Sequence, residues 1–395
     1  MAARQTRDVN LALVIVKPHA FRQSYNMSMQ ILKPDDRIDL GVGQPDPALL
    51  PQSLFQSLSI PRQSLAYGQE AGAIDFRERL AQWLSADVRQ TVQASDLLVT
   101  TGSSNALDMI CSRLAKPGDT VLVEDPTYFI ALNQLREHGL KVVAVPMDDR
   151  GLQPEALEQA IQQHAPAFIY TVPTYHNPTG ITQPDERRRN LVAMAKRYAC
   201  PLIADEVYQC LYFDQPPPPP LACYDRDAPV LSVGSFSKIL APGLRLGWIQ
   251  ASGDALQPLL NAALLKSGGG LAPVTSAIVG SLIETGAFQQ YLQSLKQILK
   301  TRRDVLWQGL TTELGERWQI NRPEGGYFIW ASQRDGLSVA DLREAAIHQG
   351  VSFLAGTKFS ANNNFVSSMR VCFAWYDAVE LEQACVRLGK VFADH

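Results

Sequence analysis

Short apolar runs that alternate with helical patterns from about residue 65 onward constrain the fold more than any other feature of this sequence. Each run is apolar throughout instead of alternating with polar residues, which is typical of parallel strands covered on both faces. The predicted strands lie at residues 96–102, 120–128, 141–147, 167–173, 200–208 and 229–238. Helical spacing of apolar residues predicts helices at 74–84 and 103–115. The pattern therefore predicts an α/β fold whose mostly parallel sheet is sandwiched by helices.

The pattern changes near residue 285, where a long helical segment at 288–310 follows. Strand candidates then lie at 325–331 and 369–375, with a helix at 339–350 between them. This change predicts a second, smaller α+β domain. The expected segments are an N-terminal arm at 1–50 that is part of the small domain, a large domain at 51–284 and the small domain at 285–395.

The net charge of −3 and the absence of a long basic run argue against nucleic-acid binding, because neutralising phosphates requires clustered cations. The most basic short stretch, ERRRN at 186–190, is expected to be a solvated helix face. The five prolines at 216–220 are expected to form a rigid surface spacer. No apolar run approaches the roughly 20 residues needed to cross a bilayer, so no membrane association is expected.

The six cysteines show neither the spacing of a metal site nor the pattern of a disulfide framework. They are Cys111, Cys200, Cys210, Cys223, Cys372 and Cys385. We interpret them as small core residues of a protein in a reducing compartment. The expected location is therefore the cytoplasm, and no bound metal is expected.

The N-terminal 28 residues are the hardest part of the sequence to interpret. The run LALVIVKPHAF at 11–21 is too short and wrongly flanked for a signal peptide. It superficially resembles the opening strand of nucleoside diphosphate kinases, but no catalytic histidine motif accompanies it. Chance or a family-specific arm is the favoured explanation. Another possibility is that Met27 or Met29 is the natural start.

Open sheets of this kind bind ligands outside the carboxyl ends of their strands, so the residues at those ends are the functional candidates. The strand at 96–102 ends at Gly102, and Ser103 and Ser104 open the following helix. The free N–H groups and the dipole of a helix N-terminus favour a phosphate there. The alternative is a simple N-cap.

Two further strand ends carry polar side chains. Asp205 ends the strand in the segment 200–208, and its burial is costly unless it meets a cation or a donor. Asp205 therefore either faces water or serves a ligand, and Tyr208 would lie on the same side of a helical turn. Asn177, in an Asn-Pro turn, offers an amide donor at the same edge. His176 has no evident partner, so a structural role is favoured.

The segment GSFSKILAPGLRLG at 234–247 combines one lysine with donors suited to phosphate. Ser235, Ser237 and Arg245 supply hydroxyl and guanidinium groups. Burial of Lys238 would lower its pKa and favour the neutral amine that attacks carbonyls, whereas a surface lysine is the alternative. A phosphate cradle, an acid, an amide, a phenol and an amine are together the groups that hold pyridoxal phosphate.

Four motifs carry a family resemblance: TTGSxxAL, NPTG, DExY and GSFSKxLxPGLRLG. They resemble the fold-type I pyridoxal-phosphate aminotransferases of class I and II, most of all the branch of 2-aminoadipate and kynurenine aminotransferases. The resemblance runs from about Leu40 to the C-terminus. It implies an aspartate-aminotransferase-like large domain with a seven-stranded sheet. It also implies a ping-pong transfer of an amino group between an L-amino acid and a 2-oxo acid.

The resemblance implies a role for each candidate residue. Lys238 would form a Schiff base with the cofactor and move a proton as general acid and base. Asp205 would hold the proton of the ring nitrogen, and Tyr128 would stack on the ring. Asn177 and Tyr208 would contact the cofactor O3′. The phosphate would be held by Ser103, Ser104, Ser235, Ser237 and Arg245.

Substrate and partner contacts are implied in the same way. By strand alternation Arg370 lies on the opposite face from Met369, and from the sequence alone it could be a surface arginine on an edge strand. The resemblance makes it the residue that grips the substrate α-carboxylate, near Asn177 and Gly43. Tyr67 matches a tyrosine that reaches the phosphate of the neighbouring subunit, which implies a homodimer with shared active sites.

The sequence leaves the amino donor open. The segment before Leu40 is unlike the helical arm of the 2-aminoadipate branch, and KSGGGLAP at 266–273 replaces a more polar stretch. Arg22 is a candidate for binding a distal carboxylate. The main alternative activity is a pyridoxal-phosphate β-lyase. A ligand-sensing module of bacterial regulators is disfavoured, because those carry a winged helix upstream and only about 30 to 40 residues precede the motifs.

Overall fold

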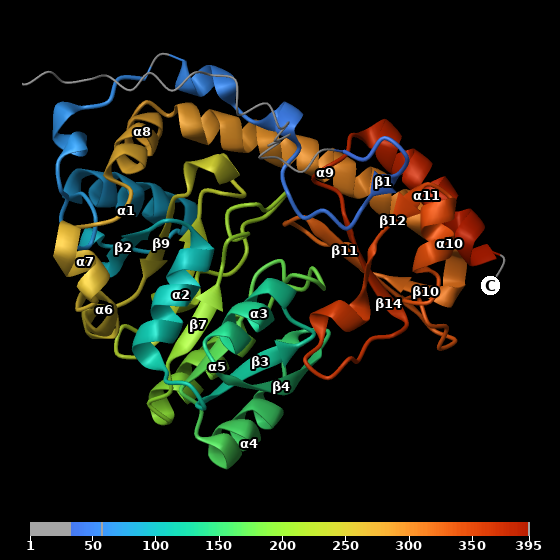
Figure 1. The fold of residues 1–395 in the computed structure, drawn as a ribbon, viewed down its shortest axis with the longest axis horizontal. Coiled ribbons are helices and arrows are strands. Elements are labelled where there is room, and N and C mark those ends of the chain that lie inside the picture. The colour runs from blue at the N-terminus through green and yellow to red at the C-terminus, as the bar shows by residue number, and fades with distance from the viewer. Residues whose placement is uncertain (1–32, 57, 394–395) are drawn as a thin grey trace, which may run out of the picture. The chain divides into compact units, whose positions relative to one another are not determined.

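An eight-stranded mixed sheet is the largest of the three sheets in the computed structural model, which describes residues 33–56 and 58–393 (Figure 1). Its strands, in spatial order, are β2 (Leu97–Thr100), β9 (Gly247–Gln250), β8 (Val230–Ser235), β7 (Leu202–Asp205), β6 (Phe168–Thr171), β3 (Thr120–Asp125), β4 (Lys141–Asp148) and β5 (Gly151–Leu152). The strands from β8 to β4 are parallel, whereas β9 is antiparallel to both of its neighbours. The predicted α/β class is therefore confirmed.

Two strands of this sheet were not marked by the sequence pattern. β9 has only four residues and follows the glycine-containing loop directly, so it gives no separate apolar run. β5 has two residues and pairs with β4 after a tight turn, in which Gly151 has a φ of 101°. This short strand makes the sheet one strand larger than the seven that the family resemblance implies.

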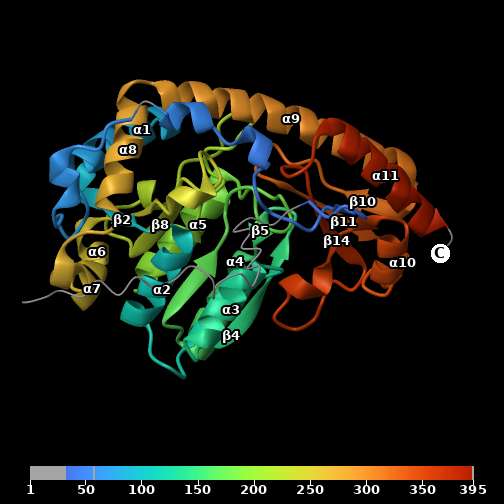
Figure 2. The ribbon, with the colours of Figure 1, turned by 45° about the horizontal axis from the view of Figure 1, so that its top comes forward.

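Helices cover both faces of the large sheet, as Figures 1 and 2 show. One face packs against α2 (Ser103–Leu114), α3 (Phe129–Glu137), α6 (Gly253–Leu260) and α7 (Ala263–Gly268). The other face packs against α4 (Pro154–His164) and α5 (Asp185–Arg197). A third group of buried side chains joins α1 (Ile74–Val88), α8 (Pro273–Glu284) and α9 (Ala287–Leu314).

A four-stranded antiparallel sheet lies in the C-terminal part of the chain. Its strands, in spatial order, are β10 (Trp318–Ile320), β11 (Phe328–Gln333), β14 (Ser368–Cys372) and β13 (Leu354–Ala355). Helices α10 (Arg343–His348) and α11 (Ala378–Ala393) belong to the same region, and α11 packs along α9. β1 (Ile38–Asp39) pairs with β12 (Val351–Ser352), which ties the segment near residue 38 to this region. The boundaries expected after residues 50 and 284 stay a prediction.

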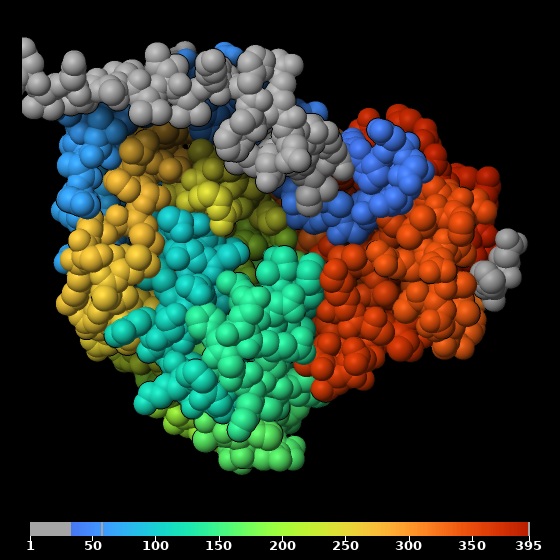
Figure 3. All heavy atoms as spheres, viewed as in Figure 1, coloured from blue at the N-terminus to red at the C-terminus, as the bar shows by residue number. Residues whose placement is uncertain are grey.

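The end of β3 touches the loop that precedes β14. Asn364 donates from Nδ2 to Asp125 Oδ2 at 2.8 Å, and the backbone N–H of Thr127 donates to the Phe359 carbonyl at 2.8 Å. Figure 3 shows a green surface of the large-sheet region lying against the orange-red C-terminal part. The large sheet and the small sheet therefore meet where strands of the large sheet end.

The basic stretch ERRRN at 186–190 is a solvated helix face only in part. Glu186, Arg189 and Asn190 are exposed, but Arg187 is 8% exposed and Arg188 is fully buried, so the expectation was wrong for these two arginines. The proline run at 216–220 is held to α5 by a hydrogen bond, since Arg188 donates to the Pro219 carbonyl at 2.9 Å. These side chains are buried because acceptors on neighbouring loops replace water around the guanidinium.

Three absences were expected from the sequence: a disulfide framework, a bound metal and a membrane span. All six cysteines are free thiols. Within residues 33–56 and 58–393, no cluster of three or more histidine, cysteine or acidic side chains is arranged to bind a metal. In the same residues no helix has the length and apolarity that crossing a membrane requires. The predictions on residues 11–21, Arg22, Met27 and Met29 lie outside the described residues.

Candidate active site

The sheet register brings the segment around Lys238 beside the N-terminus of α2. Gly247 on β9 pairs with Ser235 on β8 and with Thr100 on β2. Because β2 leads into α2 and β8 leads into the lysine segment, both connections start at the same edge of the sheet. A Cβ on Gly247 would lie 3.0 Å from the Gly102 Cα, so the backbones of the two segments are almost in contact.

The N-terminus of α2 and Arg245 together form a basic cradle. Gly102 has a φ of 100°, and a Cβ there would lie 2.9 Å from Arg245 Nη2. Ser103 is partly exposed, Ser104 is exposed, and the first N–H groups of a helix have no partner within the helix. The backbone N–H of Ser237 donates to Ser235 Oγ at 3.1 Å. The five residues predicted to hold a phosphate thus lie on adjacent segments whose donors suit an anion.

Lys238 is partly buried at the end of the β8 segment. Its Nζ donates to the Gly43 carbonyl at 2.9 Å. Desolvation and the positive charge of Arg370 lower the pKa of Lys238 to about 8, whereas Cys372 and Asp205 oppose the shift. Near neutral pH this amine is therefore more often uncharged than the amine of an ordinary lysine. The uncharged form is the one that acts as a nucleophile.

Asp205 at the end of β7 has one paired and one unpaired carboxylate oxygen. Tyr170 donates its hydroxyl to Oδ2 at 2.7 Å. Oδ1 is buried and has no hydrogen-bond partner in the structure. Burial raises the pKa of Asp205, while the Tyr170 hydrogen bond and the backbone N–H of Val207 lower it. An unpaired buried acceptor of this kind suits a cationic N–H donor.

The three other side chains predicted around the ring are grouped nearby. Asn177 is 4% exposed and accepts from Arg370 Nη1 through Oδ1 at 2.9 Å. Tyr208 is buried, with its ring centroid 5.8 Å from that of Phe328. Desolvation raises the pKa of Tyr128 to about 12, and the charges of Asp205 and Arg370 also act on this hydroxyl. Asn177, Tyr208 and Tyr128 therefore lie among the other predicted site residues.

Arg370 on β14 lies between two aromatic rings. Its Cζ is 4.0 Å from the ring centroid of Phe328 and 5.0 Å from that of Phe359. Nη2 donates to the Gly41 carbonyl at 2.7 Å, but Nε is buried without a partner. A Cβ on Gly43 would lie 3.5 Å from Nη2 and 2.9 Å from Phe328 Cζ, so only glycine fits there. Arg370 is therefore a buried interior cation, not a surface arginine on an edge strand.

Tyr67 is the one predicted site residue that the structure does not bring to this group. Its side chain is 89% exposed. It lines a separate hollow of about 280 Å³ together with Ile74 and Pro273, and it lies against Gly268. Within the described part of this single chain, Tyr67 contacts none of the other predicted site residues.

His176 lies behind the site in a buried polar cluster. It is 1% exposed, and Nδ1 is 2.8 Å from Thr179 Oγ1. Its Nε2 is 3.2 Å from a carboxylate oxygen of Glu124. Glu124 also accepts from the backbone N–H of Val172 at 2.7 Å and from Gln183 Nε2 at 3.1 Å. These bonds hold the loop that carries Asn177, in agreement with a structural role for His176.

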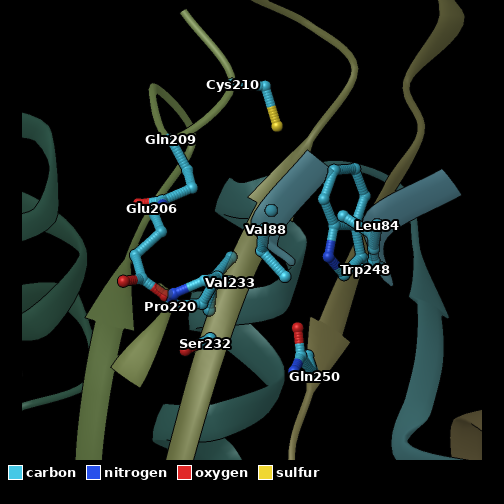
Figure 4. A pocket seen from close by; sticks show the side chains of 11 residues that line it. Leu84, Val88, Glu206, Gln209, Cys210, Pro220, Ser232, Val233, Trp248 and Gln250 are labelled. Carbon is cyan, nitrogen blue, oxygen red and sulfur yellow. The ribbon is translucent and has the colours of Figure 1, made fainter. Parts of the chain in front are cut away.

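Glu206 follows Asp205 but turns to a different cavity. Figure 4 shows its carboxylate beside Ser232 and Pro220, with Gln250 across a cavity of about 20 Å³. Burial raises the pKa of Glu206 to about 7, and Arg188, 3.3 Å away, opposes this shift. These adjacent acidic residues at the end of β7 therefore face different sides of the sheet, because side chains alternate along extended backbone.

Sequence reasoning missed three residues of the site. Tyr170 contacts Asp205, Phe328 stacks on Arg370, and Tyr327 donates its hydroxyl to the Lys238 carbonyl at 2.8 Å. Aromatic residues within apolar strands are typical of a core, so no local signal distinguished them. These three aromatic residues are recognised as site residues only once the fold shows which strands lie next to one another.

The chain is similar to known proteins over most of its length. Residues 35–388 match the family model described as aminotransferase class I and II. The 2-aminoadipate transaminase of Thermus thermophilus is 30% identical over 88% of each chain. An uncharacterized HTH-type transcriptional regulator of Bacillus subtilis, YdfD, is 28% identical over 90% of this chain and 73% of the regulator. The kynurenine aminotransferase of Pyrococcus horikoshii, solved in complex with PMP, has a TM-score of 0.82 at 28% identity and covers 91% of both chains.

Proposed function

Because the chain belongs to the aminotransferase class I and II family, whose members depend on pyridoxal phosphate, we propose that it is a transaminase. It would move an amino group between an L-amino acid and a 2-oxo acid. One observation carries this proposal: Asp205 Oδ1 and Arg370 Nε are both buried without a partner near the low-pKa amine of Lys238. A pyridinium N–H and a substrate carboxylate complement these two atoms.

The residues present fit the cofactor. Arg245 and the N-terminus of α2 suit its phosphate, since Gly102 leaves the cradle open where a Cβ would collide with Arg245. Asp205 suits the ring nitrogen, and Lys238 suits the aldehyde carbon. When bound, pyridoxal phosphate supplies an electron sink for the negative charge that develops at the substrate Cα.

The side chains of this chain would then divide the work among them. Arg370 would bind the substrate α-carboxylate and orient the Cα–H bond. Lys238 Nζ would take the Cα proton as a base and return it as an acid, which its lowered pKa favours near neutral pH. Asp205 would keep a proton at the ring nitrogen. Asn177 and Tyr208 would donate to the cofactor O3′, and Tyr128 would stack on the ring.

The exposure of Tyr67 supports a homodimer in which each subunit completes the site of the other. Tyr67 is 89% exposed, and Leu65 two residues earlier is 71% exposed. Exposed apolar side chains that lie close together are typical of an interface, whereas single ones are common on any surface. Tyr67 would reach the phosphate bound by the partner subunit. Analytical ultracentrifugation of the full chain measures this directly, and a monomer with full activity would overturn the dimer proposal.

Borohydride labelling tests the cofactor assignment. Purified protein with pyridoxal phosphate should absorb in the visible range, and reduction should fix the cofactor to Lys238. Peptide mapping identifies the labelled lysine, with Lys238→Ala as the control that should not label. Attachment at any other lysine contradicts the proposal.

A panel of amino donors tests the reaction and identifies the substrate. Loss of the visible absorbance with an amino acid, and its return with 2-oxoglutarate or pyruvate, is the expected result. Release of pyruvate and ammonia from a cysteine conjugate would instead indicate a β-lyase. Binding of amino acids without turnover of any of them would favour a ligand-sensing role, because the chain is also similar to the transcriptional regulator YdfD.

A further inference from the structure

Tyr170 on β6 makes the one side-chain hydrogen bond that Asp205 receives from the described residues. The Tyr170 side chain is 1% exposed, and its hydroxyl donates to Asp205 Oδ2 at 2.7 Å. No sequence signal marked this residue, because a tyrosine inside the apolar run AFIYTVP looks like a core side chain. Its contact with the acid of the site gives it a role beyond packing.

The sheet register explains the contact. Tyr170 pairs with Ile203 on the adjacent parallel strand β7. Asp205 is two residues beyond Ile203, so its side chain and that of Tyr170 lie on the same face of the sheet. α2 covers this face of the sheet, and Tyr170 packs in the same apolar cluster as the buried side chains of α2. The long phenol reaches past the end of the strand to the carboxylate.

The hydrogen bond has a definite direction and leaves one oxygen free. Desolvation, with the nearby charges of Asp205, Tyr128 and Glu124, raises the pKa of Tyr170 well above its ordinary value, so the phenol stays protonated. It is therefore a permanent donor to Oδ2. Oδ1 has no partner, so the carboxylate is held by one oxygen and presents the other.

The same bond favours the charged form of the acid. Burial alone makes a carboxylate protonate more readily, and a donor to the carboxylate opposes this. For Asp205 the Tyr170 hydroxyl is the largest of the opposing contributions, ahead of the Val207 N–H and the Lys238 charge. Without this donor, Asp205 would be a neutral acid more often and a weaker partner for a cation.

We propose that Tyr170 is a positioning residue for Asp205, which it holds ionised and oriented so that Oδ1 accepts the ring N–H of the cofactor. The inference rests on the proposed function. Tyr170 itself touches neither substrate nor cofactor in this role. Its effect passes through Asp205, and that dependence makes the proposal testable.

The first experiment compares Tyr170→Phe with a matched control in the cofactor-loaded enzyme. Tyr224→Phe removes a phenol–carboxylate hydrogen bond of the same 2.7 Å length, to Asp185 at the surface and outside the site. Tyr170→Phe should lower kcat roughly 10- to 100-fold with little change in KM, as expected for loss of a hydrogen bond to a charged group. Tyr224→Phe should leave both constants unchanged.

A spectroscopic titration gives a readout independent of turnover. A protonated ring nitrogen disfavours a second proton on the Lys238 nitrogen. If the ring nitrogen is protonated less often, the Lys238 nitrogen should keep its proton to higher pH, and the midpoint of the absorbance change with pH should rise. The expected shift for Tyr170→Phe is about one pH unit. An unchanged midpoint in a folded Tyr170→Phe variant overturns the proposal.

The second experiment repeats Tyr170→Phe in an Asp205→Asn background. If Tyr170 acts through Asp205, its substitution should have less than a roughly twofold further effect on kcat there, because the coupled partner is already altered. An undiminished effect would assign Tyr170 a merely structural role and overturn the proposal. If wild-type protein fails to bind pyridoxal phosphate at Lys238, the proposed function fails instead, which distinguishes the two outcomes.

Discussion

Arg188 and Arg370 are both almost completely buried, yet one is fully satisfied by the protein and the other is not. Arg188 on α5 is 0% exposed and Arg370 on β14 is 2% exposed. Desolvation lowers the pKa of both guanidinium groups. Arg188 pairs with Glu206, whereas Arg370 has no carboxylate within ion-pair distance among the described residues.

The other donors of Arg188 are used as well. Its three nitrogens also bond to acceptors on the loops around it. These acceptors are the carbonyl oxygens of Gln183, Pro219 and Pro173 and the Thr174 hydroxyl. Arg370 by contrast has an Nε with no partner. Removing a buried charge that is matched within the chain destabilises the fold, because its partners are left buried and unpaired, whereas a buried charge left partly unmatched is suited to a ligand.

The largest expected effect is the loss of stability when Arg188 is removed. Arg188→Met leaves Glu206 buried without its cation and frees four acceptors, so the free energy of unfolding should fall by about 3–5 kcal/mol. Urea denaturation measures it. Arg189→Met is the matched control, since Arg189 has a 66% exposed side chain and should change stability by less than about 0.5 kcal/mol. Equal effects at both positions would contradict the structural role of Arg188.

The same substitution at Arg370 should separate binding from stability. Arg370→Met should weaken substrate binding by about 2–5 kcal/mol while the cofactor stays bound, because the α-carboxylate loses its buried partner. The loss of stability should be smaller than for Arg188→Met, since the cost of burying an unpaired charge also disappears. Spectral titration with an amino acid and urea denaturation measure the two quantities. Unchanged substrate affinity would mean that another residue holds the carboxylate.

The pH dependence of cofactor binding tests the buried amine of the same region. The pKa of Lys238 is lowered from 10.5 to about 8, so the neutral amine becomes predominant above about pH 8. Association of pyridoxal phosphate with cofactor-free protein should accelerate up to that pH and then level off. At pH 7 about one amine in ten should be neutral. Stopped-flow absorbance measures the rate, and a rate still rising at pH 10 would contradict the lowered pKa.

The smallest expected effect is at Tyr67, which lies outside both regions. Tyr67→Phe should weaken cofactor binding by about 1.5 kcal/mol, the lower end of the range for one hydrogen bond to a charged group such as the phosphate across the dimer. Equilibrium titration of cofactor-free protein measures it. Tyr198→Phe, which removes a hydrogen bond to Glu158 near the surface, is the control. Identical affinities for the two variants would argue against a shared site.

Much of the site could be predicted from the sequence because chemistry in this fold gathers at strand ends. Asp205 ends β7, Lys238 follows β8, and Ser103 begins the helix after β2. Their positions follow from local apolar runs, which the sequence displays directly. The burial of Arg188 could not be predicted, because it depends on loops near residues 173, 206 and 219 that are distant in sequence.

The sequence by itself determined the α/β class, the motif residues and the family, because periodicity and short motifs are local properties of the chain. Tertiary structure alone decided which polar atoms have partners. It paired Tyr170 with Asp205 through strand register and left Arg370 Nε unmatched between two aromatic rings. Whether a buried charged group binds other residues of the chain or a ligand depends on which groups surround it. Those groups come from segments that are distant in sequence, so no single segment shows the answer.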